Sequence, residues 1–161
     1  MTYSRIVGTG RYLPERIMTN FELEKIVDTT DEWIRTRTGV ERRHVVAEDQ
    51  TTSDMCVEAA KKAIEDAGVD VSDIDLVITG TTSPDLIFPN VSTLIQHRLG
   101  LPACTAFSLE AACTGFIYAL TMADKFIRLG DAKCALVIGA ECITKLMDWK
   151  DRNTCVLFGD G

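Results

Sequence analysis

Residues 106–120, which read AFSLEAACTGFIYAL, limit the possible folds of this chain more than any other stretch. The pattern predicts a short apolar strand that ends near Leu109 and a helix that begins at about Ala111 and stops at Gly130. The first two turns of that helix are apolar or small on every side, which predicts a buried core helix rather than an amphipathic surface helix. Cys113 would then lie in the first turn of a buried helix.

This position predicts a nucleophilic role for Cys113. Unpaired backbone N–H groups and the helix dipole at an N-terminus favour a thiolate over a thiol, and the small neighbouring residues leave room for a ligand. The alternative is inert packing, because cysteine is among the most frequently buried residue types and most cysteines in apolar surroundings are unreactive.

Composition narrows the class of protein. The chain has 161 residues, 46% of them hydrophobic and 25% charged, which is typical of one globular domain or one half of a larger protein. A net charge of −7 argues against nucleic-acid binding, and we expect neither a membrane span nor a signal peptide. The six cysteines form no C-x-x-C pair and no metal-type cluster with the two histidines, so we predict no metal site and a reducing, cytoplasmic location.

Hydrophobic periodicity and turn residues predict strands that alternate with helices. The predicted strands cover residues 4–12, 74–81, 104–109, 134–140 and 154–158, with a basic extended segment at 40–46. One short predicted helix begins at Thr19 or Asn20. The other predicted helices cover residues 31–36, 51–67 and 90–99, besides the helix after Cys113. Such alternation indicates a three-layer α/β/α unit of about five strands with helices on both faces of the sheet.

Five stretches resemble the N-terminal half of the β-ketoacyl-[acyl carrier protein] synthase III family, thiolase-fold condensing enzymes that start fatty-acid synthesis. They stand in the same order as in the family and span nearly the whole chain: Gly8–Pro14, Asp31–Gly39, Glu41–His44, Ala111–Phe116 and Phe158–Gly161. The resemblance implies one N-terminal thiolase-like domain over residues 1–161, with a mixed, mostly parallel five-stranded sheet. It also implies a second copy of the fold in a C-terminal half outside this sequence, and a homodimer.

The resemblance assigns roles to individual residues. Cys113 matches the nucleophile that accepts an acyl group from acyl-CoA, with its backbone N–H in the oxyanion hole. Trp33 and Arg152 match the two residues that stack on opposite faces of the coenzyme A adenine, a role that suits a planar guanidinium. The other matched positions bind the nucleotide and its phosphates (Thr29, Arg37 and Thr38), or line the acyl pocket (Phe88, which crosses the dimer interface, and Ile143).

Simpler roles remain open for several of these residues. Trp33 and Phe88 could pack into the core, and the arginines could form an ordinary solvated basic face (Arg35, Arg37, Arg42 and Arg43). Neither His44 nor His97 matches the family's catalytic histidine, and His97 suits the surface near a helix C-terminus. Ser108, five positions before Cys113, stands where many relatives carry Asp, and we expect it to change a supporting contact rather than the chemistry.

The implied activity is acyl transfer from acetyl-CoA, or another short acyl-CoA, to Cys113, followed by decarboxylative Claisen condensation with malonyl-[acyl carrier protein]. The coenzyme A thioester is a substrate, and no permanently bound cofactor is expected. The family's catalytic His and Asn lie in the C-terminal half, so we expect this chain alone to acylate itself slowly at best. The last residues, Gly159–Gly161, read as the start of a turn, which predicts that the chain continues.

Two other functions fit the same residues. The first is a condensing enzyme of secondary metabolism that uses another acyl starter. The second is a truncated, catalytically inactive module for acyl-CoA binding or dimerisation.

Overall fold

The computed structural model describes residues 3–161, and their contacts divide the chain into two compact units. Unit 1 contains residues 3–12 and Thr51–Glu141, and unit 2 contains Leu13–Gln50 and Cys142–Gly161. Each unit buries apolar clusters of its own.

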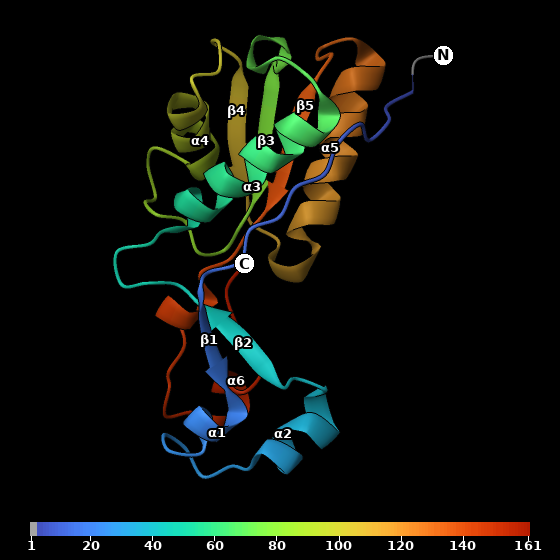
Figure 1. Cartoon of the computed structure of the whole chain (residues 1–161). Helices are drawn as coiled ribbons and strands as arrows, with labels where there is room; N and C mark the ends of the chain where they lie inside the picture. Colours follow the sequence, from blue (N-terminus) through green and yellow to red (C-terminus); the bar gives the residue numbers. More distant parts are fainter. Residues whose placement is uncertain (1–2) are drawn as a thin grey trace. The chain divides into compact units, whose positions relative to one another are not determined.

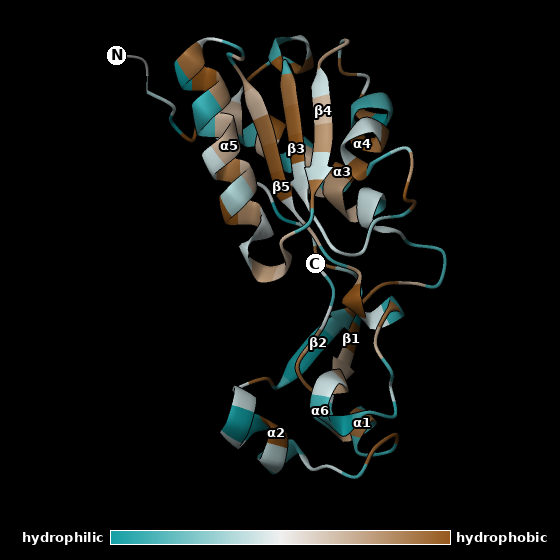
Figure 2. Cartoon of the chain, turned by 180° about the vertical axis from the view of Figure 1, so that it is seen from behind, coloured by the Kyte–Doolittle hydropathy of each residue, from teal (hydrophilic) through white to brown (hydrophobic). Residues whose placement is uncertain are grey.

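A three-stranded parallel sheet forms the centre of unit 1. Its order is β4 (Thr105–Leu109), β3 (Leu76–Gly80) and β5 (Ala135–Gly139). All residues of β3 are buried, as its near-continuous apolar sequence predicts for a strand covered on both faces. Figure 2 shows β3 in brown along most of its length. Because Gly80 is in register with Leu109 and Gly139, the three strands end at the same edge.

Helices cover both faces of this sheet (Figure 1). Helices α3 (Thr52–Ala67) and α4 (Val91–Leu99) pack on the face that carries Val77, and the 3₁₀ turn Val71–Asp73 joins α3 to β3. Helix α5 (Gly115–Leu129) packs on the opposite face, which carries Leu76 and Ile78. The predicted α/β class, with helices on both faces of a parallel sheet, is confirmed.

The helix ends in unit 1 follow local signals in the sequence. Thr51 and Asp54 form a capping box at the start of α3, and the Asn90 side chain accepts a hydrogen bond from the N–H of Thr93 at the start of α4. Gly68 and Gly130 end α3 and α5 with φ angles of 63° and 85°, a region that glycine adopts without strain. Both predicted stops are confirmed.

The predicted strand at residues 4–12 is wrong. This segment pairs with no strand among residues 3–161 and lies along α3 instead. A Cβ atom on Gly8 would lie 2.5 Å from the Ala63 carbonyl oxygen, so only glycine allows the backbone so close to the helix. The N–H of Thr9 donates to the Asp66 carboxylate over 2.8 Å. A side chain of α3 therefore takes the place of a neighbouring strand as hydrogen-bond partner.

Unit 2 is built on a small antiparallel ribbon. Strand β1 (Arg16–Thr19), which the sequence did not predict, pairs with β2 (Arg42–Val45) inside the predicted basic segment. Around this ribbon lie α1 (Asn20–Leu23), α2 (Asp31–Thr38), the 3₁₀ turn Ile143–Lys145 and α6 (Arg152–Cys155). The strands of the described chain thus form two sheets, and not the single five-stranded sheet that was expected.

The predicted strand at residues 154–158 is also wrong, because residues 154–155 end α6 and residues 156–157 form a turn. The Asp151 carboxylate accepts hydrogen bonds from the N–H of Asn153 and the hydroxyl of Thr154, both over 2.9 Å. The backbone N–H of Asn153 is the main reason that the pKa of Asp151 lies below its usual value. This N-terminal cap starts a helical turn and overrides the preference of Thr154 and Val156 for strands.

The buried carboxylate of Asp160 connects the two segments of unit 2. It accepts hydrogen bonds from the N–H of Val46 over 2.8 Å, and from the N–H and the hydroxyl of Thr144 over 2.9 and 2.5 Å. The polar group of Asp160 thus satisfies backbone donors from both segments in the interior of the unit.

Candidate functional site

Cys113 lies in the 3₁₀ turn Ala112–Thr114 that leads from β4 into α5, and its side chain is exposed. The prediction that it lies in the first turn of a buried helix is wrong. Helix α5 begins only at Gly115, and its buried residues are Gly115, Ala119 and Ala123. The apolar residues of its other face, which suggested burial in the sequence, are exposed in the described chain (Phe116, Ile117, Tyr118 and Met122).

The backbone before Cys113 turns sharply. Ala112 has a φ of 44°, in the left-handed region that an L-residue other than glycine enters at a cost of about 1–2 kcal/mol. The N–H and the hydroxyl of Thr114 both donate to the carbonyl oxygen of Ala111, over 3.1 and 2.8 Å, and close the turn. Strain of this kind is often found at active sites.

Glycines hold this turn against the end of the sheet. A Cβ on Gly80 would lie 2.6 Å from the carbonyl carbon of Gly115, and one on Gly139 would lie 2.9 Å from the Cβ of Phe116. The first turn of α5 therefore rests directly on the ends of β3 and β5. The carboxyl edge of a parallel sheet is where α/β proteins usually bind ligands.

Ser108 supports the strand that precedes the turn. Its hydroxyl donates to the Asn90 side-chain oxygen over 3.3 Å and accepts from the N–H of Ser92, also over 3.3 Å. Ser108 thus connects β4 to the N-terminus of α4 through uncharged hydrogen bonds.

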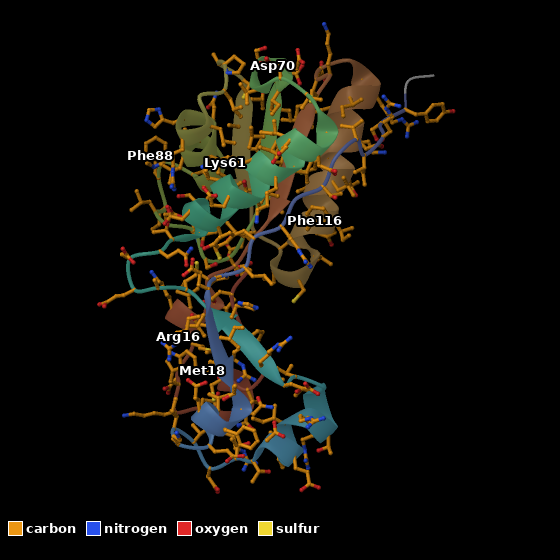
Figure 3. All side chains as sticks on the ribbon, viewed as in Figure 1. Arg16, Met18, Lys61, Asp70, Phe88 and Phe116 are labelled. Carbon is orange, nitrogen blue, oxygen red and sulfur yellow. The ribbon has the colours of Figure 1, made fainter. Side chains whose placement is uncertain are left out.

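Phe88 lies in the loop between β3 and α4 with 86% of its surface exposed. Figure 3 shows it on the loop beside α4. The alternative that Phe88 packs into the core of the described chain is therefore wrong.

In unit 2, two guanidinium groups lie over the ring of Trp33. The central carbons of Arg37 and Arg152 are each 4.5 Å from the ring centroid. Arg37 is one helical turn after Trp33 on α2, and Arg152 on α6 also donates to the carbonyl oxygen of Asp28 over 2.9 Å. The structure thus brings together three of the residues predicted to bind the nucleotide.

Trp33 combines a packing role with an accessible surface. One part of its side chain packs against the buried cluster of unit 2, and the residue is half-buried overall. At the present 4.5 Å, a planar base can enter between the indole and Arg152 only if the guanidinium moves outward. The arrangement can therefore stack a base, provided that Arg152 changes position.

The two threonines predicted to bind the nucleotide differ in their hydrogen bonding. The hydroxyl of Thr29 is buried and has no partner among residues 3–161, so a ligand reaches it only if the residues that cover it move. The hydroxyl of Thr38 donates to the Ile34 carbonyl over 2.8 Å and accepts from the N–H of Val40 over 3.0 Å. Its only proton is therefore committed to the backbone. Ile143, the predicted pocket wall, is half-buried in the 3₁₀ turn of unit 2.

Arg43 does not belong to a solvated basic face, because it is only 4% exposed. Its Nη2 donates to the Asn20 side-chain oxygen and to the Val156 carbonyl, both over 3.1 Å, while Nε and Nη1 have no partner among the described residues. Burial lowers the pKa of Arg43. The other three arginines of that segment are exposed (Arg35, Arg37 and Arg42).

Neither histidine belongs to the Cys113 turn or to the Trp33 stacking arrangement. Nδ1 of His44 lies 2.5 Å from the carbonyl oxygen of Pro14, and His97 is exposed in the last turn of α4, as predicted for a surface residue. Among residues 3–161, no three His, Cys, Asp or Glu side chains are arranged to hold a metal ion. No helix formed by the same residues is long and apolar enough to cross a membrane.

The sequence did not point to two acidic residues that fix the loop after β3. Glu141 accepts hydrogen bonds from the N–H of Thr82 over 2.8 Å and from the hydroxyl of Ser83 over 2.5 Å. Asp85 accepts from the N–H and hydroxyl of Ser53. The sequence signal that could have indicated Glu141 is its position: it follows β5, this loop follows β3, and these two parallel strands end at the same edge of the sheet.

The fold and the cysteine turn at the carboxyl edge of the parallel sheet define a thiolase-like α/β unit. The family model described as 3-oxoacyl-[acyl-carrier-protein] synthase III matches residues 107–161. Over 159 residues the chain is 62% identical to a β-ketoacyl-[acyl-carrier-protein] synthase III of Xanthomonas campestris, covering 99% of this chain and 49% of that protein.

Solved structures give the same result. The 3-oxoacyl-[acyl-carrier-protein] synthase III of Aquifex aeolicus is 51% identical with a TM-score of 0.94, over 97% of this chain and 50% of that one. The priming β-ketosynthase of a polyketide biosynthetic pathway is 40% identical with a TM-score of 0.96, over 99% of this chain and 48% of that one. The chain is thus a homologue of β-ketoacyl-[acyl-carrier-protein] synthase III and spans about half the length of the relatives that it matches.

Proposed function

We propose that the protein which contains this chain is a β-ketoacyl-[acyl carrier protein] synthase III that starts fatty-acid synthesis. The observation that carries the proposal is the exposed Cys113 on a strained turn at the carboxyl edge of the parallel sheet. This placement leaves the sulfur accessible to a thioester, while the glycine contacts of α5 fix the backbone beneath it.

In the first half-reaction, Cys113 Sγ forms a bond to the carbonyl carbon of acetyl-CoA. The bond between that carbon and the coenzyme A sulfur breaks, and coenzyme A leaves with the proton that the cysteine gave up. In the second half-reaction, malonyl-[acyl carrier protein] loses CO₂, and the resulting carbanion attacks the carbonyl carbon of the acetyl group on Cys113. The bond between that carbon and Cys113 Sγ breaks, and the released thiolate takes up a proton from solvent. The products are 3-oxobutanoyl-[acyl carrier protein] and the free cysteine.

The nucleotide end of coenzyme A is assigned to unit 2. Stacking of adenine between Trp33 and Arg152 requires the guanidinium to leave its present position against the indole, and Arg37 then supplies positive charge for the phosphates. The Thr29 hydroxyl has an uncommitted proton, and its role in this site requires the residues that cover it to move. The hydrogen bonds of Thr38 with the backbone make its proposed role the weaker of the two.

The remaining assignments follow the resemblance. Phe88, with 86% of its surface exposed, suits a residue that meets a partner subunit at the acyl pocket of a homodimer, and Ile143 is assigned to the wall of that pocket. The condensation step depends on a His and an Asn of the C-terminal half, and the reaction is assigned to the cytoplasm.

A second candidate is a priming synthase that uses a different acyl starter. The similarity to the priming β-ketosynthase of a polyketide pathway favours it, because that chain is 40% identical with a TM-score of 0.96. The two enzymes would share the chemistry at Cys113 and differ in the preferred acyl-CoA. A module that only binds acyl-CoA or dimerises would leave Cys113 unmodified.

The test is the intact mass of the full-length protein before and after incubation with acetyl-CoA, followed by mapping of the adduct. We expect a single acetyl group on Cys113 and none in the Cys113→Ala variant. Cys104→Ala is the matched control, because burial raises the pKa of the Cys104 thiol and this variant should acylate normally. An unmodified wild-type protein, or an adduct that persists in Cys113→Ala, would contradict the proposal. Replacing acetyl-CoA with longer or branched acyl-CoA thioesters distinguishes the second candidate.

A further inference from the structure

The loop between β3 and α4 presents three consecutive apolar side chains to solvent. Leu86, Ile87 and Phe88 are 54%, 99% and 86% exposed, and together they are called the apolar tip. Exposed apolar surface of this kind is unfavourable in water and marks interaction sites. Since the tip does not pack into the core of unit 1, other contacts must determine where it lies.

Asp85, the residue immediately before the apolar tip, provides such a contact. Its Oδ1 accepts the backbone N–H of Ser53 over 2.8 Å, and its Oδ2 accepts the Ser53 hydroxyl over 2.5 Å. Ser53 is the second residue of α3, so the carboxylate meets the helix end at which N–H groups are unpaired and the dipole favours negative charge. Asp85 therefore attaches the loop to a rigid helix.

Arg98 of α4 orients this contact. Its Nη1 donates to the Ser53 hydroxyl over 2.8 Å, and its Nη2 donates to Asp54 over 2.6 Å. Because the Ser53 oxygen accepts from Arg98, its own proton is directed to Asp85. Arg98, Ser53 and Asp85 thus form a directed chain of hydrogen bonds from α4 to the loop.

The loop is also held on both sides of Asp85 and the tip. Before them, the Thr52 hydroxyl donates to the carbonyl of Ser83 over 2.5 Å. After them, Asn90 caps α4 and accepts from the Ser108 hydroxyl. Asp85, three residues before Phe88, provides the side-chain attachment that lies between these two points.

We infer that Asp85, acting through Ser53, is a positioning residue that sets the location of Phe88 and thereby the length of acyl chain that the enzyme accepts. The inference rests on the proposed function, in which Phe88 borders the acyl pocket. Without the Asp85 carboxylate, the loop keeps only its attachments at Ser83 and Asn90, so Phe88 samples several positions between them and limits the pocket less sharply. The chemistry at Cys113 is unchanged, because Asp85 contacts none of the reacting groups.

The experiment measures kcat/KM of the full-length protein for acetyl-CoA and for hexanoyl-CoA, and compares their ratio between variants. We expect Asp85→Ala to change the ratio by about tenfold in favour of the longer chain, the scale of discrimination by apolar pockets. Asp85→Asn should give a smaller change, because its amide oxygen still accepts the Ser53 N–H. This variant also provides a measurement if Asp85→Ala folds poorly.

Asp75→Ala is the matched control. The Asp75 carboxylate likewise accepts backbone N–H groups, those of Lys133 and Cys134 over 2.9–3.0 Å, but it precedes β3 whereas the loop follows that strand. It should destabilise the protein and leave the ratio unchanged. Equal ratios in Asp85→Ala and wild type, or equal changes in Asp85→Ala and Asp75→Ala, would overturn the inference.

Phe88→Ala separates this inference from the proposed function. If Phe88→Ala changes the ratio and Asp85→Ala does not, the positioning role fails while the assignment of Phe88 stands. If Phe88→Ala leaves the ratio unchanged, the assignment of Phe88 to the acyl pocket fails, and the inference about Asp85 fails with it.

Discussion

The two units hold their functional residues by different means. In unit 1 the turn of Cys113 is fixed by direct backbone contact, since Gly80 and Gly115 allow α5 to rest on β3. In unit 2 the buried interior includes polar groups, among them Asp160 and Arg43, and the Trp33 ring is covered by two arginine side chains. A nucleophile benefits from a fixed backbone, whereas a stacking site needs an arginine that can move.

The strongest test of this comparison is Gly80→Ala in unit 1. The new Cβ would lie 2.6, 2.8 and 2.9 Å from backbone atoms of Gly115 and Phe116, and these atoms cannot move unless α5 moves. We expect a loss of about 3 kcal/mol or more in the free energy of unfolding, together with slower acylation of Cys113. Urea denaturation and the acylation rate of the full-length protein measure the two effects.

Gly100→Ala is the control for this substitution. Its Cβ would meet no atom within 4 Å, and its φ of 66° adds only the cost of about 1–2 kcal/mol for a residue other than glycine in the left-handed region. A loss of stability in Gly80→Ala no larger than that in Gly100→Ala would show that backbone contact does not fix the start of α5.

A different contrast, between repeating apolar contacts and single polar contacts, explains which elements could be predicted from the sequence. The apolar run of β3 and the periodicity of α3 predicted both elements correctly, because their contacts are apolar and repeat along the chain. Residues 4–12 and 154–158 were predicted as strands, and the structure shows neither, because single polar side chains, Asp66 and Asp151, determine the local backbone. Such a contact leaves no periodic signal.

The candidate site divides in a similar way. The motif around Cys113 and the stacking residues Trp33 and Arg152 were found through the resemblance of their local sequences. The sequence did not indicate the burial of Arg43 or the attachment of Asp85 to α3, because both depend on residues distant in the chain. The apolar residues of α5 predicted a buried helix, but one apolar face of α5 is exposed in the described chain. An apolar sequence does not indicate which other residues cover the helix.

In unit 2 the corresponding test is Asp160→Asn. Both carboxylate oxygens accept hydrogen bonds from Val46 and Thr144, so the amide would place an NH₂ group opposite one of these donors. We expect the free energy of unfolding to fall by about 2–3 kcal/mol, less than in Gly80→Ala. Chemical denaturation measures the change, with the exposed Asp49→Asn as a control within about 0.5 kcal/mol of wild type. A near-neutral Asp160→Asn would mean that unit 2 does not depend on this buried acceptor.

The smallest effect is expected for Arg43→Met, which tests whether every buried polar group of unit 2 stabilises it. Arg43 is 4% exposed, donates only through Nη2, and leaves Nε and Nη1 unpartnered within the described chain. Burial of such a charge is costly, so its removal should offset the loss of the hydrogen bonds to Asn20 and Val156. The Asn20 amide keeps its donors paired with Asp31 and Val40.

We therefore expect the free energy of unfolding of Arg43→Met to stay within about 1 kcal/mol of wild type, with the exposed Arg42→Met as control. A loss of about 3 kcal/mol or more would contradict this expectation, because it would show that the buried guanidinium is fully compensated in the protein. Asp160 and Arg43 would then stabilise unit 2 in the same way. The contrast with the backbone contacts of unit 1 would be sharper, since buried polar groups of both charges would hold the stacking site in place.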